Sequence, residues 1–478
     1  MNLGDKLQDA YTNLNSVLTD INTNLVEKGV SEVNNFSGIG DEIRKITQTM
    51  GKSELIESIM DRTVVEVGSE NIEIIGARAC ADCSKLATVS FPACISINNG
   101  AFYNCSSLTS ANFPACTTIG AYAFTYCYSL TSVSFPACTT ISDTVFAFCS
   151  SLANINFPAC TTISSSAFYG CDNLTSADFP ACTTIGASAF QGCNELKTIN
   201  FPVCKNIRED AFCMCANLIS ANFPACTAMS RYAFHSCNNL TTADFPICTS
   251  INSNVFRSCS SLTSINFPVC KSISHSAFYS CSSLTSASFP VCTTIREAAF
   301  YNCASLSNVH FPACTSIGSE AFAYCHNLVS VSFPACIYIS SHAFSHCDSL
   351  TTVDFPVCTT ISNTVFAFCS SLANINFPAC TTIGYYAFSN CSNLANISLP
   401  ACTTIGSSAF YGCKSLMSLT LANSSVAQLY NKNAFSYTPI YSSGYTRKFG
   451  SIYVPASLVD AYKAATNWAT YAARITSI

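Results

Sequence analysis

Hydrophobic positions along most of the chain recur with a period of 22 residues. Phenylalanine or leucine stands at the same place in each repeat, from Phe91 and Phe113 to Leu399, and a proline follows each one. Cysteine recurs every 11 residues from Cys83 to Cys413 and accounts for nearly all of the 33 cysteines. A fixed period of about 20 to 50 residues is typical of repeat arrays, so we predict one long solenoid.

A single repeat shows how the pattern predicts a coil. Apolar and polar residues alternate around Ala111 and Phe113, which indicates a strand with its apolar side chains turned inward. Pro114 lacks a backbone N–H and should end this strand. Ala123 and Phe124 precede Cys127 by four and three residues, a spacing that predicts a short helical turn. The predicted core of this coil consists of Phe113, Cys116, Ile119, Phe124, Cys127 and Leu130.

The cysteines fall where the coil should be narrow and where a small apolar side chain fits. Free cysteine is among the most buried residue types and packs as a small hydrophobe. Coils stacked about 4.8 Å apart would allow ladder disulfides, but synthesis in a reducing cytoplasm argues against them. A catalytic thiol would need an exposed, electropositive setting. We therefore predict buried, reduced thiols with a packing role.

Charge and hydropathy narrow the classes of partner. The formal net charge is −5, only 10% of residues are charged, and no basic patch is visible, so we expect no nucleic-acid partner. No apolar run reaches the length of about 18 residues that crosses a bilayer, so we expect no membrane insertion. The N-terminus lacks the apolar segment of a signal peptide, which favours cytoplasmic synthesis without conventional export.

Residues with catalytic or metal-binding chemistry form no convincing site. Cys80 and Cys83 make a lone C-x-x-C pair, and a structural zinc would need a second pair. His326, His342 and His346 fall in neighbouring repeats, but surface histidines are more often solvated than metal-bound. The chain lacks a glycine-rich phosphate loop and a G-x-S-x-G elbow. We predict no catalytic residues, no metal, no cofactor and no enzymatic activity.

The first 50 residues carry a different pattern, with apolar positions spaced alternately four and three apart. These positions are Leu7, Tyr11, Leu14, Leu18, Ile21 and Leu25. Such a seam is typical of a coiled coil, and its mixture of side chains favours more than two strands, so we predict a homotrimer. The alternative is an amphipathic helix that packs on the solenoid.

The change in pattern along the chain predicts four regions. They are an N-terminal helical attachment segment (1–50), an N-terminal cap with a first, degenerate repeat (51–90), the regular solenoid (91–413) and a C-terminal cap (414–478). In the last region, Phe435 echoes the A-F turn of the repeats. A helix is predicted to begin at Pro455, with Trp468 available to cover the open end of the core.

The repeat "FPACTTIGAYAFTYCYSLTSVS" (113–134) resembles the BspA-type leucine-rich repeat, marked by I-G-x-x-A-F-x-x-C-x-x-L. This resemblance implies an α/β solenoid, wound as a right-handed coil, with a strand ladder and short helical turns. Family members are often adhesins, so it also implies a binding role. The segments "NLVEKGV…FSGIGDEIRKI" (24–46) and "GSIYVPASLVDAYKAATNWATYAARITSI" (450–478) are similar to the ends of phage tail-associated multi-repeat proteins.

Residues around the A-F turn vary from repeat to repeat, whereas the inward positions hardly vary. Tyrosine and arginine are favoured at binding surfaces. The predicted ligand-binding residues are Tyr103, Tyr126, Tyr169, Arg231, His235, Arg257, Tyr279, Tyr301, Tyr324, Tyr386 and Tyr411. The alternative is that these side chains serve solubility and coil stacking. The strand face is plainer and polar, with residues such as Asp178 and Asp244.

These observations favour a phage tail or fibre-associated adhesin, located in the virion after cytoplasmic synthesis. Its expected partners are a protein or glycan on a bacterial surface and, through the N-terminus, other tail proteins. The alternatives are a bacterial cell-surface adhesin for host protein or mucus, and a structural spacer or scaffold. The repeated threonines, as at Thr117 and Thr118, also permit an ice- or crystal-binding face.

Overall fold

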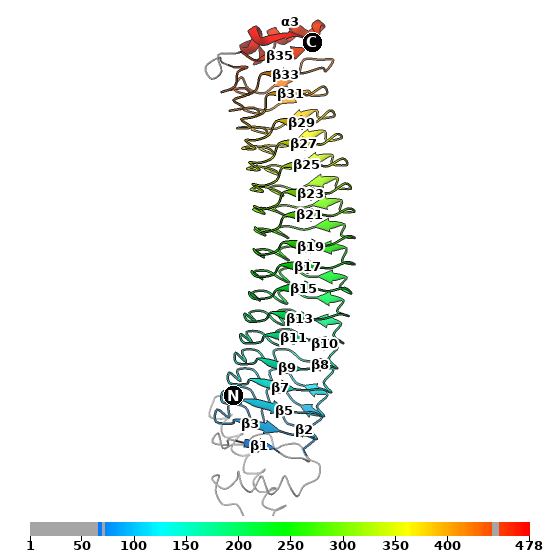
Figure 1. The fold of residues 1–478 in the computed structure, drawn as a ribbon, viewed down its shortest axis with the longest axis vertical. Helices are drawn as coiled ribbons and strands as arrows, with labels where there is room; N and C mark the ends of the chain where they lie inside the picture. The colour runs from blue at the N-terminus through cyan, green and yellow to red at the C-terminus, as the bar shows by residue number, and fades with distance from the viewer. Residues whose placement is uncertain (1–65, 69–71, 442–448) are drawn as a thin grey trace, which may run out of the picture. The chain divides into compact units, whose positions relative to one another are not determined.

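The computed structural model describes residues 66–68, 72–441 and 449–478. The predicted N-terminal seam, from Leu7 to Leu25, lies outside the described residues. The chain divides into two compact units, Met1–Cys160 and Thr161–Ile478. Within each unit the described residues form a parallel β-solenoid of stacked coils, whose labelled strands follow one another in Figure 1. The solenoid prediction is confirmed, while the predicted right-handed sense of the coil stays a prediction.

Every regular coil contains one strand of three residues and one of two. In the first unit the strands are β1 (Glu66–Gly68), β2 (Ile74–Ile75), β3 (Thr88–Ser90), β4 (Ser96–Ile97), β5 (Ser110–Asn112), β6 (Thr118–Ile119), β7 (Ser132–Ser134), β8 (Thr140–Ile141) and β9 (Asn154–Asn156). The three-residue strands pair in the order β1-β3-β5-β7-β9, and the two-residue strands pair in the order β2-β4-β6-β8. The coil therefore has two separate strand faces.

The second unit repeats this arrangement. Its two-residue strands are β10 (Thr162–Ile163), β12 (Thr184–Ile185), β14 (Asn206–Ile207), β16 (Ala228–Met229), β18 (Ser250–Ile251), β20 (Ser272–Ile273), β22 (Thr294–Ile295), β24 (Ser316–Ile317), β26 (Tyr338–Ile339), β28 (Thr360–Ile361), β30 (Thr382–Ile383), β32 (Thr404–Ile405) and β34 (Gln428–Leu429). Its longer strands are β11 (Ser176–Asp178), β13 (Thr198–Asn200), β15 (Ser220–Asn222), β17 (Thr242–Asp244), β19 (Ser264–Asn266), β21 (Ser286–Ser288), β23 (Asn308–His310), β25 (Ser330–Ser332), β27 (Thr352–Asp354), β29 (Asn374–Asn376), β31 (Asn396–Ser398), β33 (Ser418–Thr420), β35 (Ser451–Val454) and β36 (Ile475–Ser477).

Strand register follows the sequence period. Ala111 lies opposite Val133, and Val133 lies opposite Ile155, so each residue pairs with the one that is 22 positions later. Because parallel pairing aligns equivalent positions of successive coils, each type of side chain forms a column along the stack. We number these columns from the phenylalanine of the repeat, so that Phe113 is position 1 and Ser134 is position 22.

The predicted helical turn around Ala123 and Phe124 is wrong. Positions 9 to 14 instead form consecutive turns in which positions 10 and 14 have left-handed backbone, with φ of 61° at Tyr122 and 63° at Tyr126. The alternation sends N–H groups in two directions: Phe124 donates to the carbonyl of Val145 in the next coil, at 2.9 Å, while Thr125 donates within its own coil. Stacked coils thus gain a third hydrogen-bonded seam, which offsets the cost of about 1–2 kcal/mol per left-handed residue. Within the described residues, helices occur only between residues 456 and 474.

Two columns of phenylalanine form the centre of the core. Rings at position 1 stack on one another, as Phe113 does on Phe135 at 5.3 Å, and rings at position 12 do the same, as Phe124 does on Phe146 at 5.4 Å. The two columns meet edge to face, at 6.1 Å between Phe113 and Phe124. The six residues predicted as the core of this coil are all buried.

All 33 cysteines are buried, as predicted. They also make contacts that the sequence did not indicate. At position 4 the Sγ–H of Cys116 donates to the carbonyl of Thr118 at 3.2 Å, and at position 15 that of Cys127 donates to the carbonyl of Phe102 at 3.2 Å. A thiol is a weak donor that tolerates apolar surroundings. Cysteine therefore fills the narrow corner of the coil and also donates a hydrogen bond to a backbone carbonyl there.

The C-terminal residues pack over the last coil. Here the chain forms η2 (Ala456–Leu458), α3 (Val459–Ala464) and η3 (Trp468–Arg474) between β35 and β36. Phe435 stacks on Phe410 at 5.3 Å between ring centres, and Tyr471 contacts the Phe435 ring edge to face, also at 5.3 Å. Trp468 is buried and donates its indole N–H to the carbonyl of Ala427 at 2.7 Å.

Candidate functional site

The predicted ligand-binding residues lie on the turn side of the coils, at positions 9 to 14. In the second unit four of them join His346 and Phe368 in a continuous row, which we call the C-terminal aromatic row. Its members are Arg257, Tyr279, Tyr301, Tyr324, His346 and Phe368, one from each of six successive coils. The Arg257 guanidinium lies 4.1 Å from the centre of the Tyr279 ring, and Tyr279 stacks on Tyr301 at 4.8 Å.

Ring faces in this row are mostly turned toward the neighbouring coil. His346 is stacked between Tyr324, at 4.6 Å, and Phe368, at 4.5 Å, with both pairs within 6° of parallel. Burial lowers the pKa of His346, although the nearby Asp348 carboxylate acts in the opposite direction. Because their faces contact one another, these rings offer mainly edges and polar atoms to a ligand. The alternative of coil stacking therefore accounts for part of the pattern.

A shorter row lies in the first unit, and we call it the N-terminal aromatic row. It contains Arg78, Tyr103, Tyr126 and Phe148. Tyr126 stacks on Phe148 at 5.2 Å, whereas Tyr103 stands almost perpendicular to Tyr126, at 82°. The Arg78 guanidinium is 5.4 Å from the centre of the Tyr103 ring. The Tyr103 ring therefore lies across the row instead of continuing the stack.

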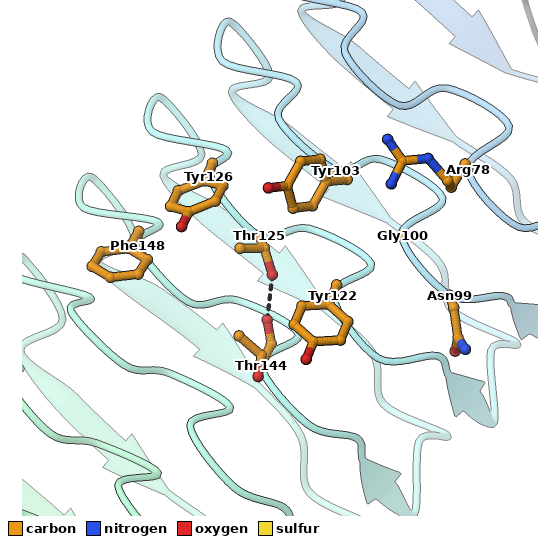
Figure 2. Close-up of a pocket in the computed structure, with 9 residues that line it drawn as sticks. All are labelled: Arg78, Asn99, Gly100, Tyr103, Tyr122, Thr125, Tyr126, Thr144 and Phe148. Carbon is orange, nitrogen blue, oxygen red and sulfur yellow. Dashed lines mark hydrogen bonds between the residues drawn. The ribbon is translucent and has the colours of Figure 1, made fainter. Parts of the chain in front are cut away.

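A groove of about 380 Å³ runs beside this row. Figure 2 shows its lining, with Tyr103, Tyr126 and Phe148 along one side and Tyr122 on the other. The remaining lining residues are Arg78, Asn99, Gly100, Thr125 and Thr144. The Thr125 hydroxyl donates to the carbonyl of Thr144 and so is already engaged. The groove combines flat aromatic surface with amide and hydroxyl groups, and Arg78 is its one charged lining residue.

The other predicted residues are distributed over further coils. Arg231 forms an ion pair with Glu209, with 2.6 Å between Nε and Oε1, and His235 Nδ1 lies 3.1 Å from the carbonyl oxygen of Arg257. Tyr411 contacts Tyr437 edge to face at 5.0 Å. Tyr169 and Tyr386 belong to coils that contribute to neither aromatic row. The predicted residues therefore do not converge on one site.

Polar side chains on the longer strands bind one another across coils. The Asn200 amide donates to the Asp178 carboxylate, Asn266 to Asp244 and Asn376 to Asp354, each at 2.7 Å. These hydrogen bonds are exposed and lie at position 22 of successive coils. Because these polar groups partner each other, the strand face has fewer groups available for a ligand than its composition indicated.

The described part of the chain contains neither a candidate metal site nor a candidate membrane-spanning helix. Among the described residues, histidine, cysteine, aspartate and glutamate form no cluster of three that could hold a metal ion. Cys80 and Cys83 are both buried. No helix within residues 66–68, 72–441 and 449–478 has the length and apolarity that a membrane span requires.

Reading the sequence for tyrosine and arginine missed several members of the site. Arg78, Phe148, His346 and Phe368 complete the two rows, and Gly100 lines the groove. The signal was present in the period, since these residues occupy the same positions, 10 and 14, as Tyr122 and Tyr126. Comparing the residues at one position across all coils reveals these members of the site.

Stacked coils with parallel strands and an L-x-x-Φ-x-Φ-x-x-C repeat (Φ, apolar) define a leucine-rich repeat solenoid. The family model described as "BspA type Leucine rich repeat region" matches residues 65–175, 161–285, 249–371 and 337–454. The chain belongs to this family.

Solved structures show similarity to the solenoid. A leucine-rich repeat protein from Bacteroides ovatus is 24% identical, with 70% of this chain and 87% of that chain covered and a TM-score of 0.45. A leucine rich cell surface protein from Faecalibacterium prausnitzii is 22% identical, with 66% and 88% covered and a TM-score of 0.36. No curated protein matched the chain.

Proposed function

We propose that this protein is a non-enzymatic binding protein that contacts a bacterial surface component through the turn side of its solenoid. The observation that carries the proposal is the contrast between columns. Positions 1, 12 and 18 hold nearly the same residue in every coil, whereas positions 10, 13 and 14 differ from coil to coil and gather aromatic and arginine side chains. A constant scaffold that presents a variable, aromatic-rich surface suits recognition.

The setting that we propose is a phage tail or fibre. It is supported by the resemblance of residues 24–46 and 450–478 to phage tail-associated proteins. The heptad seam would join three chains and attach them to other tail proteins, so that several solenoids project together. Tethering raises effective concentration, and weak contacts from each chain then add to strong overall binding.

A bacterial cell-surface adhesin is the second candidate. It would present the same turn side to a host protein or mucus, and the family's adhesins favour it. A spacer or scaffold is the third, and the stacking of the outer rings on each other favours it.

Binding to cells tests the proposal directly. Fluorescently labelled full-length protein is titrated onto a panel of bacterial cells, and the double variant Tyr279→Ala/Tyr301→Ala is compared with Asn266→Ser on the strand face. We expect about tenfold weaker binding or more for the tyrosine variant, since each aromatic contact contributes about 1 kcal/mol. The control should bind like the wild type. Equal binding by both variants, with folding confirmed by melting, would support the spacer instead.

Light scattering tests the proposed attachment through the N-terminal heptad seam separately from the proposed binding surface. Full-length protein should be trimeric and residues 51–478 monomeric, because about 20 helical residues need partner chains to be stable in water. A monomeric full-length protein would contradict the coiled-coil prediction and leave the binding proposal to the cell assay.

A further inference from the structure

We propose that the groove over Gly100 binds a linear, uncharged oligosaccharide, with one sugar ring inserted between Arg78 and Tyr122. This assignment deepens the proposed function, on which it rests, by naming the chemical class of ligand at one place on the turn side. The groove lies wholly in the first unit, among residues 78 to 148.

The groove exists because one side chain of a column is missing. Arg78, Gly100 and Tyr122 occupy position 10 in three successive coils, and Gly100 is the only glycine at this position among the described coils. Coils are spaced by about 4.8 Å, so the backbones at Arg78 and Tyr122 stand roughly 10 Å apart along the stack. A flat ring placed midway would contact a side chain on each of its two faces.

The walls of this gap suit a neutral ligand. The Tyr122 side chain is 51% exposed, so part of its surface is available. The Arg78 guanidinium lies 5.4 Å from the centre of the Tyr103 ring and 3.6 Å from the Asp82 carboxylate, which balances its charge. An anionic ligand would compete with Asp82, whereas sugar hydroxyls can accept from the remaining guanidinium N–H groups.

Polar groups in the lining match hydroxyls. Asn99 accepts the backbone N–H of Ala121 through Oδ1 at 3.0 Å, which fixes its amide and leaves the NH2 group as a donor. The phenol groups of Tyr103 and Tyr122 can each donate and accept. A few placed polar groups beside flat apolar walls are typical of small-ligand sites.

Backbone groups are not available to a peptide. The N–H of Gly100 donates to the carbonyl of Ala121, at 2.9 Å, and that of Tyr122 donates to the carbonyl of Asp143, at 3.1 Å. A peptide that added as a strand would need free N–H and C=O groups along an edge. Because these N–H groups are already bonded, side chains must supply the hydrogen bonds to a ligand here, which favours a sugar chain over an extended peptide.

The N-terminal aromatic row extends the site along the stack of coils. Tyr126 follows Tyr103 at 5.5 Å, and Phe148 follows Tyr126 at 5.2 Å, so each coil contributes one ring beside the groove (Figure 2). Successive residues of an extended sugar chain advance by a distance close to this coil spacing. The ligand we infer is therefore a chain of several sugars that runs along the coils, with one ring inserted at Gly100.

Two variants should impair ligand binding in the gap, one by filling it and one by removing a wall. Gly100→Tyr would fill it, at a cost of about 1–2 kcal/mol for left-handed backbone that Tyr122 already bears at the same position, with φ of 61° against 63° at Gly100. A Cβ on Gly100 would lie 3.4 Å from Arg78 Cγ and 3.8 Å from Tyr103 Cβ, which are ordinary contacts. Tyr122→Ala removes one wall. Ser188→Tyr adds the same side chain at position 10 of a coil outside both rows and serves as the control.

Calorimetric titration of full-length protein with linear β-linked hexasaccharides of glucose, N-acetylglucosamine, xylose and mannose tests the inference. We expect at least one to bind with a Kd of about 1 mM or tighter, and Gly100→Tyr and Tyr122→Ala to weaken it about tenfold or more. Ser188→Tyr should bind like the wild type. Melting curves verify that each variant is folded. If none of the four sugars binds, or if the three variants bind alike, the inference is wrong.

Treated cells decide between a sugar and a protein as the occupant. If Gly100→Tyr weakens cell binding, the wild-type protein should no longer bind cells that have been oxidised with periodate. It should still bind cells that have been treated with protease. Survival of periodate with loss after protease would identify a protein and overturn the inference. If cell binding depends on Tyr279 and Tyr301 but not on Gly100, the proposed function stands while the sugar groove fails.

Discussion

The phenylalanine columns inside the solenoid and the aromatic rows outside it have nearly the same stacking geometry. Phe124 and Phe146 lie 5.4 Å apart at 11°, and Tyr279 and Tyr301 lie 4.8 Å apart at 6°. Their burial differs, since Phe124 is fully buried and Phe368, the last ring of the C-terminal aromatic row, is 45% exposed. Hydrogen bonding between coils therefore sets the ring spacing both inside and outside the core. Burial decides how much each ring stabilises the fold.

The largest effect should come from breaking the columns themselves. Deleting Phe245–Asn266, which is 22 residues, rejoins equivalent positions and should leave a folded protein that is one coil shorter. Deleting residues 245–255, which is half a period, places strand residues where the turn belongs and should abolish folding of the second unit. Circular dichroism and gel filtration compare the two. If both variants fold equally well, the 22-residue coil is not the structural unit.

Thiols in the inner columns should be strongly protected. Burial raises the pKa of Cys138 to about 11 and that of Cys204 to about 12, and the thiolate is the reactive form. We expect a thiol reagent to modify the native protein roughly a thousandfold more slowly than the denatured protein, because exposure requires opening of the coils. Intact mass after labelling in denaturant should show all 33 cysteines reactive. Many unreactive cysteines there would reveal disulfides.

A single inner ring should matter more than any outer one. Phe234 is fully buried and stacks on Phe212 at 5.2 Å and on Phe256 at 5.5 Å. Phe234→Ala should lower the free energy of unfolding by about 3–5 kcal/mol, through lost burial and the cavity that remains. Urea denaturation measures this loss. A stability close to that of the wild type would show that this column is not the core.

The corresponding outer change should cost less. Tyr301 contacts Tyr279 at 4.8 Å and Tyr324 at 5.2 Å but is only partly buried. Tyr301→Ala should lower the free energy of unfolding by about 1 kcal/mol, the usual contribution of an aromatic pair, while Tyr301→Phe keeps the ring and serves as control. A loss as large as that for Phe234→Ala would remove the distinction between inner and outer rows.

The smallest effect should be a dependence on pH. Burial lowers the pKa of His346 in the fold, with Asp348 acting in the opposite direction and His326 and His342 adding to the decrease. The unfolded chain then binds more protons below its pKa of about 6.5, so stability falls as the pH drops below that value. In His346→Phe, which keeps the stack, the decrease in melting temperature between pH 7.5 and pH 5 should be smaller. An unchanged decrease would contradict this assignment.

Much of the fold was predictable from the sequence because its signal is repetition. The period of 22 residues predicted the coil, and the alternation around Ala111 predicted the strand that the structure shows as β5. The turn was predicted wrongly, because the spacing of Phe124 and Cys127 suits a helix and a series of tight turns equally well. The two-residue strands were missed, since Thr118 and Ile119 alone are too short to show alternation.

The sequence by itself determined the columns: once equivalent residues recur every 22 positions, parallel register is the arrangement that buries them all. Only the tertiary structure decided the backbone conformation and the surface that some of these columns produce. The left-handed residues at positions 10 and 14 are stabilised by hydrogen bonds to the next coil, which are contacts that no single repeat contains. The period places Arg78, Gly100 and Tyr122 in one column, but only the stacked coils turn the missing side chain at Gly100 into a groove. These features depend on contacts between residues far apart in the chain, which local pattern does not encode.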